Sequence, residues 1–579
     1  MIRILAFVVL LLCLSVTRAH PREMFLAGGA MHICSSLTLS DCDSTPSSFR
    51  GARGTPRYRI DDAAMAHALS PKLWLKGERA PRLESVRALL TEALRKNGNR
   101  EIDADAMFDV FDSLCTRAEP GRLGTCRNDK TPRPWRNLLD SERSAILAAL
   151  ELPAPSADRR LREIASLDHS KRSEGVAILR AFVAAAAQRS QGRKPLIAVV
   201  TASSNDTFDP VDFYLSALRE AGAEPVWWPL DAALAAAVHA GKGCDALADL
   251  RLEILALPAR EAVFPDLVAA QLAACRNPDA LLGMADRMQG VFFSGGDQWR
   301  LRQAFFDSKD QPNAWLKKLR TLYARGDIVV GGTSAGTAVQ SGLAMLSNGE
   351  TERALVSGAI AATPPEPGCT RALRCLPGQD ESDLTYWPLG GLALEAGWVF
   401  DTHFSERARE LRLLQLLHDS GSRWGIGVDE TSAIHLRSTE NGIEFEALGA
   451  SGAWIFDFDP ALQTPPKLRA RVHYVAPGAR LVWADQTLTL GSASLNSSAD
   501  HSRRRLSSDA LEGGALRASA VRLAIQSAPV QVMNAGHGDV RLKRTASTRS
   551  WSSPAGQIGI SDIIIEYSPA SQPPHVEAR

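Results

Sequence analysis

The stretch Asp327-Ile-Val-Val-Gly-Gly-Thr-Ser-Ala-Gly-Thr-Ala-Val339 decides the fold. It begins with an apolar run typical of a buried strand and ends in small and apolar residues that suit a helix. Between them, Gly332-Thr-Ser-Ala-Gly336 matches the Gly-x-Ser-x-Gly nucleophile elbow, whose glycines let the backbone turn sharply beneath a raised serine. The pattern predicts Ser334 as a nucleophile at a turn between a strand and a helix. A Gly-rich turn that binds phosphate or merely packs is the alternative.

Other short apolar runs flank this stretch in both directions. They lie at residues 24–27, 196–200, 225–229, 290–293, 398–400 and 425–428, and helical patterns such as 210–221 follow several of them. This alternation indicates a parallel α/β core with the layers of a three-layer α/β sandwich. Three of the strands end in polar or Gly-rich turns, at Ser294, Gly331 and Asp401. Since ligand groups gather at the carboxyl ends of parallel strands, we expect the functional site there.

The first residues predict export. Arg3 supplies a positive charge, residues 4–16 form an apolar segment, and Thr17-Arg-Ala19 fits a small-x-small cleavage site, so the mature chain is expected to begin near His20. An uncleaved anchor is the alternative, but thirteen apolar residues are too few to cross a bilayer as a helix. We therefore expect a secreted or periplasmic protein without membrane attachment after cleavage.

The remaining chain shows a large core and two interruptions. With 579 residues and 45% hydrophobic content it can bury more than one structural unit. We expect these units: 1–19 signal peptide, 20–41 first strand region of the catalytic domain, 42–193 helical insertion, 194–477 catalytic domain, and 478–579 a β-rich or partly disordered C-terminal extension. A second interruption, 363–383, is Pro-rich and suits a surface loop stapled by its two cysteines.

Cysteines and charge narrow the class of protein. Apart from Cys13, the eight cysteines fall as close pairs, which in an oxidising compartment suggests neighbour-to-neighbour disulfides: Cys34 with Cys42, Cys115 with Cys126, Cys244 with Cys275, and Cys369 with Cys375. A zinc site is the alternative, but neither Cys-x-x-Cys nor a nearby histidine pair gives metal-ligand spacing. The net charge of +1 gives no basic bias for nucleic acid. We predict neither a metal nor a nucleic-acid partner.

A serine nucleophile requires a base and an acid that orients the base. Residue type selects none of the twelve histidines, but His403 follows the apolar run 398–400 and so lies at a predicted strand end, like Ser334. This position favours His403 as the base, and an ordinary structural histidine is the alternative. The backbone N–H groups of Ala335 and Gly296 are the expected oxyanion donors, because Ala335 opens the helix and Gly296 lies in a turn at a neighbouring strand end.

Four linked motifs follow one another along the chain: Ser294-Gly-Gly-Asp-Gln298, Gly332-Thr-Ser-Ala-Gly336, Asp401-x-His-Phe-x-x-Arg-x-Arg-x-x-Arg412 and Gly425-Ile-Gly-Val-Asp-Glu-Thr431. Together they resemble the cyanophycinases of the S51 serine peptidase family. The similarity covers about residues 24–40 and 194–477.

The resemblance implies a flavodoxin-like sheet related to class I glutamine amidotransferases, with serine in place of their cysteine. It makes Ser334 the nucleophile and His403 the base, without an organic cofactor. It places the orienting acid shortly after the nucleophile helix, where Glu352 fits best and Glu350 is the alternative. It also suggests a homodimer.

The resemblance further implies a substrate. Residues that match substrate-holding positions are Gln298, Asp401, Arg407, Arg409 and Arg412. Cyanophycin is polyaspartate with arginine joined to each β-carboxyl, so its binder needs cations for carboxylates and an acid or amides for guanidinium groups. The expected products are β-aspartyl-arginine dipeptides. Thr402 departs from the usual glutamine and, with the insertions, keeps open an S51-like peptidase for aspartyl or isoaspartyl peptides. The amount of chain outside the catalytic core keeps open a second alternative, a non-catalytic binding protein on the same fold.

Overall fold

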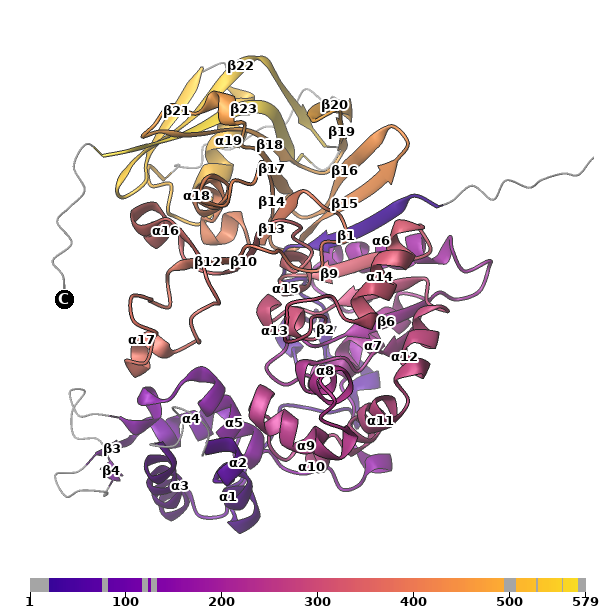
Figure 1. Ribbon diagram of the computed structural model, residues 1–579, viewed down its shortest axis with the longest axis vertical. Helices are drawn as coiled ribbons and strands as arrows, with labels where there is room; N and C mark the ends of the chain where they lie inside the picture. The colour runs from indigo at the N-terminus through magenta and orange to yellow at the C-terminus, as the bar shows by residue number, and fades with distance from the viewer. Residues whose placement is uncertain are drawn as a thin grey trace, which may run out of the picture.

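The computed structural model describes residues 20–74, 82–116, 123–125, 133–493, 507–526, 529–553 and 556–570. The fold is mixed α/β, as the sequence predicts, with its strands in several sheets (Figure 1). The predicted signal peptide, 1–19, lies outside the described residues. None of the helices in the described ranges combines the length and apolar character that a membrane span requires.

The largest sheet has nine strands in the order β20-β19-β16-β15-β1-β9-β8-β6-β7. Its parallel strands are β1 (Arg22–Ala27), β6 (Leu196–Val200), β7 (Glu224–Trp227), β8 (Gly290–Phe293) and β9 (Val329–Thr333). Antiparallel strands extend it beyond β1: β15 (Ser432–Thr439), β16 (Gly442–Gly449), β19 (Ala479–Ala484) and β20 (Thr487–Ala493). Ala27 pairs with Thr333, and Phe293 pairs with Gly332. The carboxyl ends of β1, β8 and β9 therefore meet at one edge.

Helices cover both faces of this sheet. On one face lie α6 (Ser173–Ala187) and α7 (Val211–Glu220), where Phe182 packs against Phe25 and Phe292. The other face carries α8 (Ala232–His239), α12 (Pro278–Ala285), α13 (Gln298–Gln303) and α14 (Ala314–Ala324). Outside them follow α9 (Leu247–Leu250), the π-helix η7 (Arg251–Leu255), α10 (Arg260–Val263) and α11 (Pro265–Arg276). The two helical layers and the sheet give the layered core.

A second sheet corrects the expectation of one continuous parallel core. The predicted strands at 398–400 and 425–428 are β13 (Trp398–Thr402) and β14 (Trp424–Val428), which pair in parallel in a separate seven-stranded sheet. The sheet continues antiparallel through β17 (Ala453–Asp457), β18 (Leu468–Val475), β23 (Ile558–Pro569), β22 (Gly538–Ser552) and β21 (Val530–Asn534). Its core includes α18 (Glu410–Ser420) and α19 (Ala515–Ile525).

A small sheet leads away from Ser334. Helix α15 (Ala335–Ala338) follows β9, and then β10 (Met345–Asn348), α16 (Thr351–Ser357), β11 (Ala359–Ala361) and β12 (Leu384–Trp387) follow in chain order. The three strands pair in the order β10-β12-β11. The segment between β11 and β12 contains α17 (Cys369–Ala372).

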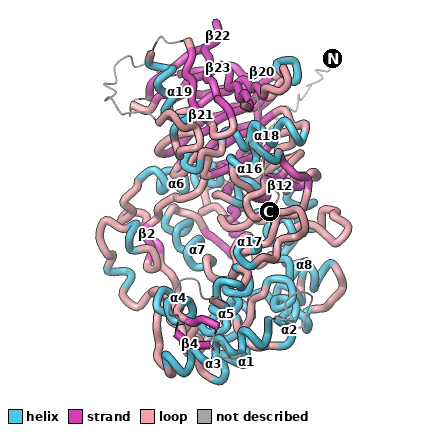
Figure 2. The backbone as a smooth tube through the Cα atoms, turned by 90° about the vertical axis from the view of Figure 1, so that its left-hand side faces the viewer, coloured by secondary structure: helices cyan, strands magenta, loops and turns pink. Residues whose placement is uncertain are grey.

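The predicted helical insertion contains a lobe with its own core (Figure 2). We call residues 58–152 the helical lobe. Its helices are α1 (Asp62–Ala68), α2 (Pro71–Trp74), α3 (Leu83–Asn97), α4 (Ala104–Asp112) and α5 (Asp140–Leu150), and it carries the short pair β3 (Leu114–Thr116) and β4 (Leu123–Thr125). Phe111 stacks on Trp135 at its centre. By contrast, α6 lies within the predicted insertion, 42–193, but packs on the main sheet, because its apolar face completes the cover of that sheet.

The C-terminal extension builds on both sheets. Strands β19 and β20 widen the first sheet, and α19 with β21, β22 and β23 completes the second. Within the described residues, most elements of 478–579 are strands. The Ser-rich segment that the sequence suggests to be mobile lies largely outside the described residues.

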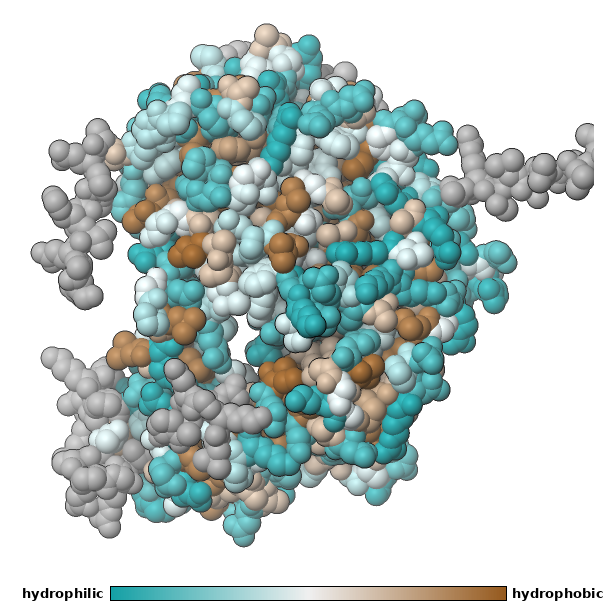
Figure 3. Space-filling view, viewed as in Figure 1, coloured by the Kyte–Doolittle hydropathy of each residue, from teal (hydrophilic) through white to brown (hydrophobic). Residues whose placement is uncertain are grey.

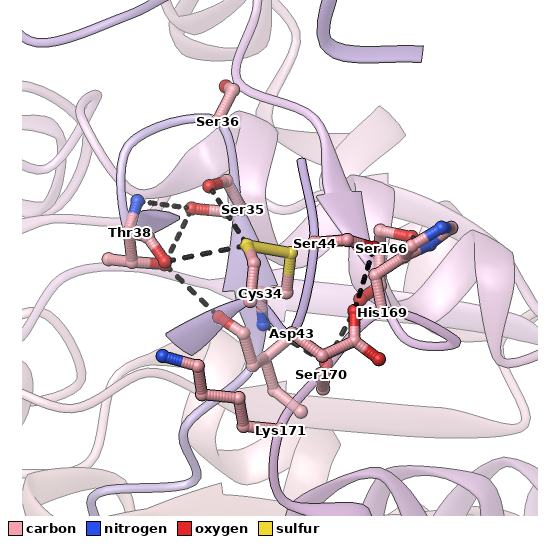
Figure 4. The surroundings of a disulfide bond; sticks show 12 residues. Cys34, Ser35, Ser36, Thr38, Asp43, Ser44, Ser166, His169, Ser170 and Lys171 are labelled. Carbon is pink, nitrogen blue, oxygen red and sulfur yellow. Dashed lines mark hydrogen bonds between the residues drawn. A yellow bond between two sulfur atoms is a disulfide. The ribbon is translucent and has the colours of Figure 1, made fainter. Parts of the chain in front are cut away.

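Three of the predicted disulfides are present in the structure: Cys34–Cys42, Cys244–Cys275 and Cys369–Cys375. The first fastens the turn after β2 (Cys34–Ser35), which pairs with β5 (Ala165–Ser166) where the chain leaves the core and returns to it (Figure 4). The hydroxyl of Ser170 accepts a hydrogen bond from the Cys34 N–H there. Cys126 of the fourth predicted pair lies outside the described residues.

Candidate active site

Ser334 occupies the turn between β9 and α15 in a left-handed backbone conformation, with φ 52° and ψ −115°. This conformation is strained for a residue with a side chain, and it recurs at functional sites. The neighbouring glycines are required by space. A Cβ at Gly332 would lie 2.5 Å from the Gly336 carbonyl oxygen, and one at Gly336 would lie 2.2 Å from that of Phe293. The elbow predicted from the sequence is thus formed.

His403 reaches the serine from the second sheet. It follows β13, and its N–H donates to the carbonyl of Gly28 after β1, 2.8 Å away. Its Nε2 lies 2.9 Å from Ser334 Oγ. A Cβ at Gly29 would lie 2.3 Å from the imidazole, so only glycine allows this approach. The strand ends of both sheets meet at this point, which brings the predicted nucleophile and base together.

The acid beside the histidine is Glu430, and this corrects the prediction of Glu352 or Glu350. Glu430 Oε1 lies 2.6 Å from His403 Nδ1. Glu352 instead lies 3.8 Å from His537, with a side chain that is 69% exposed, and Glu350 is also exposed. The physical reason is topological, because the chain passes from the elbow into the small sheet, whereas the turn after β14 lies beside the end of β13.

The position of Glu430 in the sequence is itself a signal for a functional residue. The residue directly follows the predicted strand 425–428, within one of the four motifs. The strand-end criterion that selected His403 applies to it equally.

Polar groups behind Glu430 hold it in place. These groups, Glu406, Asp429 and Arg517, were not predicted from the sequence. The N–H of Glu430 donates to Glu406 Oε2 at 2.9 Å. Glu406 and Asp429 both pair with Arg517 of α19, whose guanidinium lies 2.8 Å from Asp429 Oδ2. Asp429 also accepts a hydrogen bond from the N–H of Ser405. The C-terminal extension therefore contributes a side chain to the support of the acid.

The surroundings favour a neutral imidazole. Burial lowers the pKa of His403, and the hydrogen bond that the imidazole donates to Glu430 opposes this. The charges of Arg407 and Arg409 lower the pKa further, so that it lies below the ordinary value of 6.5. A neutral imidazole with its Nδ1 proton directed at Glu430 can accept the proton of Ser334 through Nε2. The arrangement can therefore activate the serine near neutral pH.

Backbone N–H groups lie beside the nucleophile. Ala335 is the first residue of α15, so its N–H belongs to the free end of a helix. The turn at Gly295 and Gly296 approaches from β8: a Cβ at Gly295 would lie 3.5 Å from the Cβ of Ser334. Gly296 has φ 137° and is packed against the Ser203 carbonyl. Both predicted oxyanion donors thus belong to segments that flank Ser334.

The predicted substrate residues fall into two groups. Asp401 and Arg412 form a buried, two-point ion pair, with Nε–Oδ2 and Nη2–Oδ1 distances of 2.9 and 2.6 Å. Burial raises the pKa of Asp401, but Arg412 more than offsets this and holds it below its ordinary value. These two residues satisfy each other and fix the turn that carries His403. Because they pair with each other, this geometry argues against their direct contact with substrate.

The other group, Arg407, Arg409 and Gln298, lines the cavity. Arg407 is exposed. Arg409 Nη1 donates a hydrogen bond to the carbonyl of Thr402, 2.6 Å away. Burial, followed by the charge of Arg412, lowers the pKa of Arg409 to about 9. Gln298 donates its amide to the Leu346 carbonyl at 2.8 Å. The short 3-10 turn η8 (Ser405–Arg407) precedes α18, which lets the arginines approach the cleft from a turn rather than from one helix face.

A cavity of about 1150 Å³ opens onto these residues. Its walls come from the core, from α5 of the helical lobe and from the Pro-rich segment after β11. The lining includes Ser334, His403, Arg407, Ser144, Ala148 and Pro365. Among the described residues, no cluster of three or more histidine, cysteine, aspartate or glutamate side chains could hold a metal ion.

Comparison with known proteins finds similarity of sequence to curated cyanophycinases. The protein of Geminocystis herdmanii (strain PCC 6308) is 28% identical over 194 residues, which cover 31% of this chain and 57% of that protein. Those of Synechococcus elongatus and Thermosynechococcus vestitus (strain NIES-2133 / IAM M-273 / BP-1) are each 28% identical over 202 residues, covering 35% of this chain and 52% of theirs. This chain is a distant relative of cyanophycinases. It spans about half the length of the curated relatives it matches.

The chain was also compared with protein-family models and with solved structures. No protein-family model matches the chain. Among solved structures, a peptidase from an acI-B1 Actinobacterium is 13% identical, with a TM-score of 0.31, and the match covers 53% of this chain and 91% of that one. The similarity to cyanophycinases therefore rests on about a third of this sequence.

Proposed function

We propose that this protein is an exported, cyanophycinase-like serine hydrolase. The observation that carries the proposal is the chain of contacts from Ser334 to His403 to Glu430, with the serine raised on a strained elbow. Nucleophile, base and orienting acid in hydrogen-bond reach are the constellation of acyl-transfer enzymes on unrelated folds. The parallel strand order β7-β6-β8-β9-β1 further supports a flavodoxin-like core.

The reaction would proceed in two steps. Ser334 Oγ attacks the amide carbonyl while His403 takes the proton of the serine hydroxyl. The N–H groups of Ala335 and Gly296 stabilise the oxyanion that forms. His403 then gives that proton to the leaving amine, which departs from the acyl-enzyme. Water attacks the acyl carbon with His403 again as base, which releases the carboxylate product and the free serine. Glu430 keeps the imidazole oriented and stabilises its charged form.

Cyanophycin is the proposed substrate, with β-aspartyl-arginine dipeptides as products. Arg407 and Arg409 lie beside the histidine and offer guanidinium donors to carboxylates in the cleft. The similarity to cyanophycinases supports the same substrate. The mutual pairing of Asp401 with Arg412 and the presence of Thr402 favour the second candidate, a peptidase for aspartyl or isoaspartyl peptides.

Export and assembly belong to the proposal as well. The three disulfides support an oxidising compartment, which is secreted or periplasmic. A homodimer stays a prediction from the family resemblance.

The test is incubation of the mature protein with soluble cyanophycin, followed by mass analysis of the products. We expect β-aspartyl-arginine dipeptides from the parent and a loss of roughly a million-fold in kcat for Ser334→Ala, with unchanged circular dichroism. A serine-reactive phosphonate should label Ser334 in the parent. Cleavage of short aspartyl peptides but not cyanophycin would establish the second candidate. Binding without turnover, and without labelling, would establish a non-catalytic protein.

A further inference from the structure

Ser203 lies in the loop after β6, against the turn after β8. We call residues 294–297 the Gly296 turn. The hydroxyl oxygen of Ser203 lies 2.9 Å from the carbonyl oxygens of both Ser294 and Gly295, and 2.7 Å from the Ser294 hydroxyl. Because the Ser294 hydroxyl can donate to it, the Ser203 hydroxyl can direct its own proton at these carbonyls. Ser203 is thus a hydrogen-bond donor to the backbone of the Gly296 turn.

The backbone of Ser203 holds the same turn. The N–H of Asp297 donates to the Ser203 carbonyl at 2.7 Å. A Cβ at Gly296 would lie 2.2 Å from that carbonyl oxygen, so the close approach requires glycine. On the other side, the N–H of Gly295 donates to the phenol oxygen of Tyr214 in α7, 3.4 Å away. The turn is therefore held immediately before and after Gly296.

The carbonyl of Gly295 and the N–H of Gly296 belong to one peptide group. A trans peptide group is planar, so its C=O and its N–H point in opposite directions. A hydrogen bond from Ser203 to the carbonyl therefore sets the direction of the N–H. It also polarises the peptide group, which makes the N–H a stronger donor, because hydrogen bonds in series reinforce one another.

Ser203 lies behind the wall of the active site. On one face, the molecule is hollowed between the helical lobe and the rest of the protein (Figure 3). Gly296 and Ser334 line the cavity of the active site, whereas Ser203 is fully buried and is not part of that lining. A side chain in this position acts on the reaction through the Gly296 turn and not by contact with substrate.

The loop that carries Ser203 is closed on itself. The hydroxyl of Thr201 donates to the carbonyl of Thr207 at 2.6 Å and accepts a hydrogen bond from the indole N–H of Trp227 at 3.0 Å. The N–H of Ser204 donates to the Thr201 carbonyl at 3.1 Å. The position of Ser203 is therefore set by the core before any substrate binds.

We propose that Ser203 is a positioning residue of the active site, whose hydroxyl aims the N–H of Gly296 at the oxyanion. The inference rests on the function proposed above, in which this N–H stabilises the charge that forms on the substrate carbonyl. Donors that are held in place act mainly in the transition state, where that charge develops. Loss of the hydroxyl should therefore lower kcat and leave KM nearly unchanged.

The test is Ser203→Ala, which removes the hydroxyl and keeps the backbone carbonyl that holds Asp297. Kinetics are measured on cyanophycin or, if the parent does not cleave it, on short aspartyl peptides. We expect kcat to fall about ten- to a hundred-fold with KM changed less than two-fold, because the N–H remains but loses its fixed direction. Ser203→Cys keeps a weak donor and should give an intermediate kcat.

Two further measurements separate positioning from other effects. The rate at which the serine-reactive phosphonate labels Ser334 should fall by a factor similar to that of kcat, since negative charge also develops on a phosphonate oxygen. The midpoint of the acidic limb of kcat/KM should not change, because the hydrogen bonds of the Ser203 hydroxyl go to the Gly296 turn and not to His403.

Ser190→Ala is the matched control. The hydroxyl of Ser190 is also buried and also donates to two backbone carbonyls, those of Ala187 and Arg193, ahead of β6. Its loss should destabilise the fold to a similar extent, which denaturant unfolding measures, while kcat stays within about two-fold of the parent. An equal fall of kcat in Ser190→Ala would mean that both serines act only through stability, and it would overturn the inference.

Other outcomes would also overturn it. A kcat of Ser203→Ala within two-fold of the parent would show that the hydroxyl does not support the reaction. A rise in KM at unchanged kcat would show that Ser203 shapes the binding pocket, and a shift of the acidic limb would show that it acts on His403. A parent that is neither active nor labelled at Ser334 would instead refute the proposed function, and the inference with it.

Discussion

At the scale of single residues, the choice of acid is the sharpest test of the site. Glu430→Gln removes the charge that stabilises the imidazolium and favours the wrong tautomer of His403, since an amide can donate to Nδ1. We expect kcat to fall about 10⁴-fold, with little change in the circular dichroism spectrum. Glu352→Gln and Glu350→Gln serve as controls and should stay within about two-fold of the parent, as exposed side chains away from the base. A large loss in Glu352→Gln with an active Glu430→Gln would reverse the assignment.

The pH profile reports a second residue-level effect. His403 acts as a base only when neutral, so activity is lost as pH falls through its pKa. Arg407 lowers that pKa, and Arg407→Gln should therefore raise it and move the acidic limb of kcat/KM to higher pH. The limb in the parent should lie below pH 6.5. Arg423→Gln, which changes the same charge away from the cleft, should leave the midpoint in place; a shift of equal size there would contradict the local explanation.

At the scale of elements, helix α19 supports the proposed active site although it lies far along the chain from Ser334. Arg517 of this helix links Glu406 and Asp429, and Glu406 holds the backbone of Glu430. The backbone reinforces the contact, because a Cβ at Gly513 would lie 2.4 Å from the carbonyl of Glu406. The helix thus supports Glu430 from outside the lining of the cavity.

Arg517→Met should misplace the acid while leaving the substrate pocket intact. We expect kcat to fall by about ten- to a hundred-fold with KM changed less than two-fold, since small displacements of catalytic groups are costly to the rate. Arg517→Lys keeps one charge and should recover part of kcat. Steady-state kinetics of both, beside Arg522→Met on the same helix, give the measurement. An equal fall in the Arg522 variant would mean that α19 only stabilises the fold.

At the scale of the whole molecule, disulfides join separate segments of the chain. Cys244–Cys275 closes 31 residues between the segment after α8 and α11. Loop-closure entropy predicts that Cys244→Ser/Cys275→Ser lowers the free energy of unfolding by about 3–4 kcal/mol. Denaturant unfolding of parent and variant measures this difference, and hydrolysis of short peptides should stay within about two-fold of the parent. A variant as stable as the parent would show that this cross-link contributes nothing measurable.

Much of the fold and site followed from local sequence. Gly332, Ser334 and Gly336 specify the elbow, because a Cβ at either glycine would clash with backbone and the short apolar run before the turn is typical of a buried strand. Local sequence also predicted that His403 follows a strand and that cysteines neighbouring in the chain form disulfides. Both predictions depend on the order of residues along the chain rather than on the arrangement of the sheets.

Only the tertiary structure decided which distant groups meet. The acid is Glu430 rather than Glu352 because β13 and β14 pair side by side, and strand order is not encoded in the spacing of the two glutamates from His403. The pairing of Asp401 with Arg412 depends on burial, which removes both from water and leaves each as the other's partner. The contact between residues 363–383 and α5 joins segments that are far apart in the chain, and no local pattern of either segment specifies it.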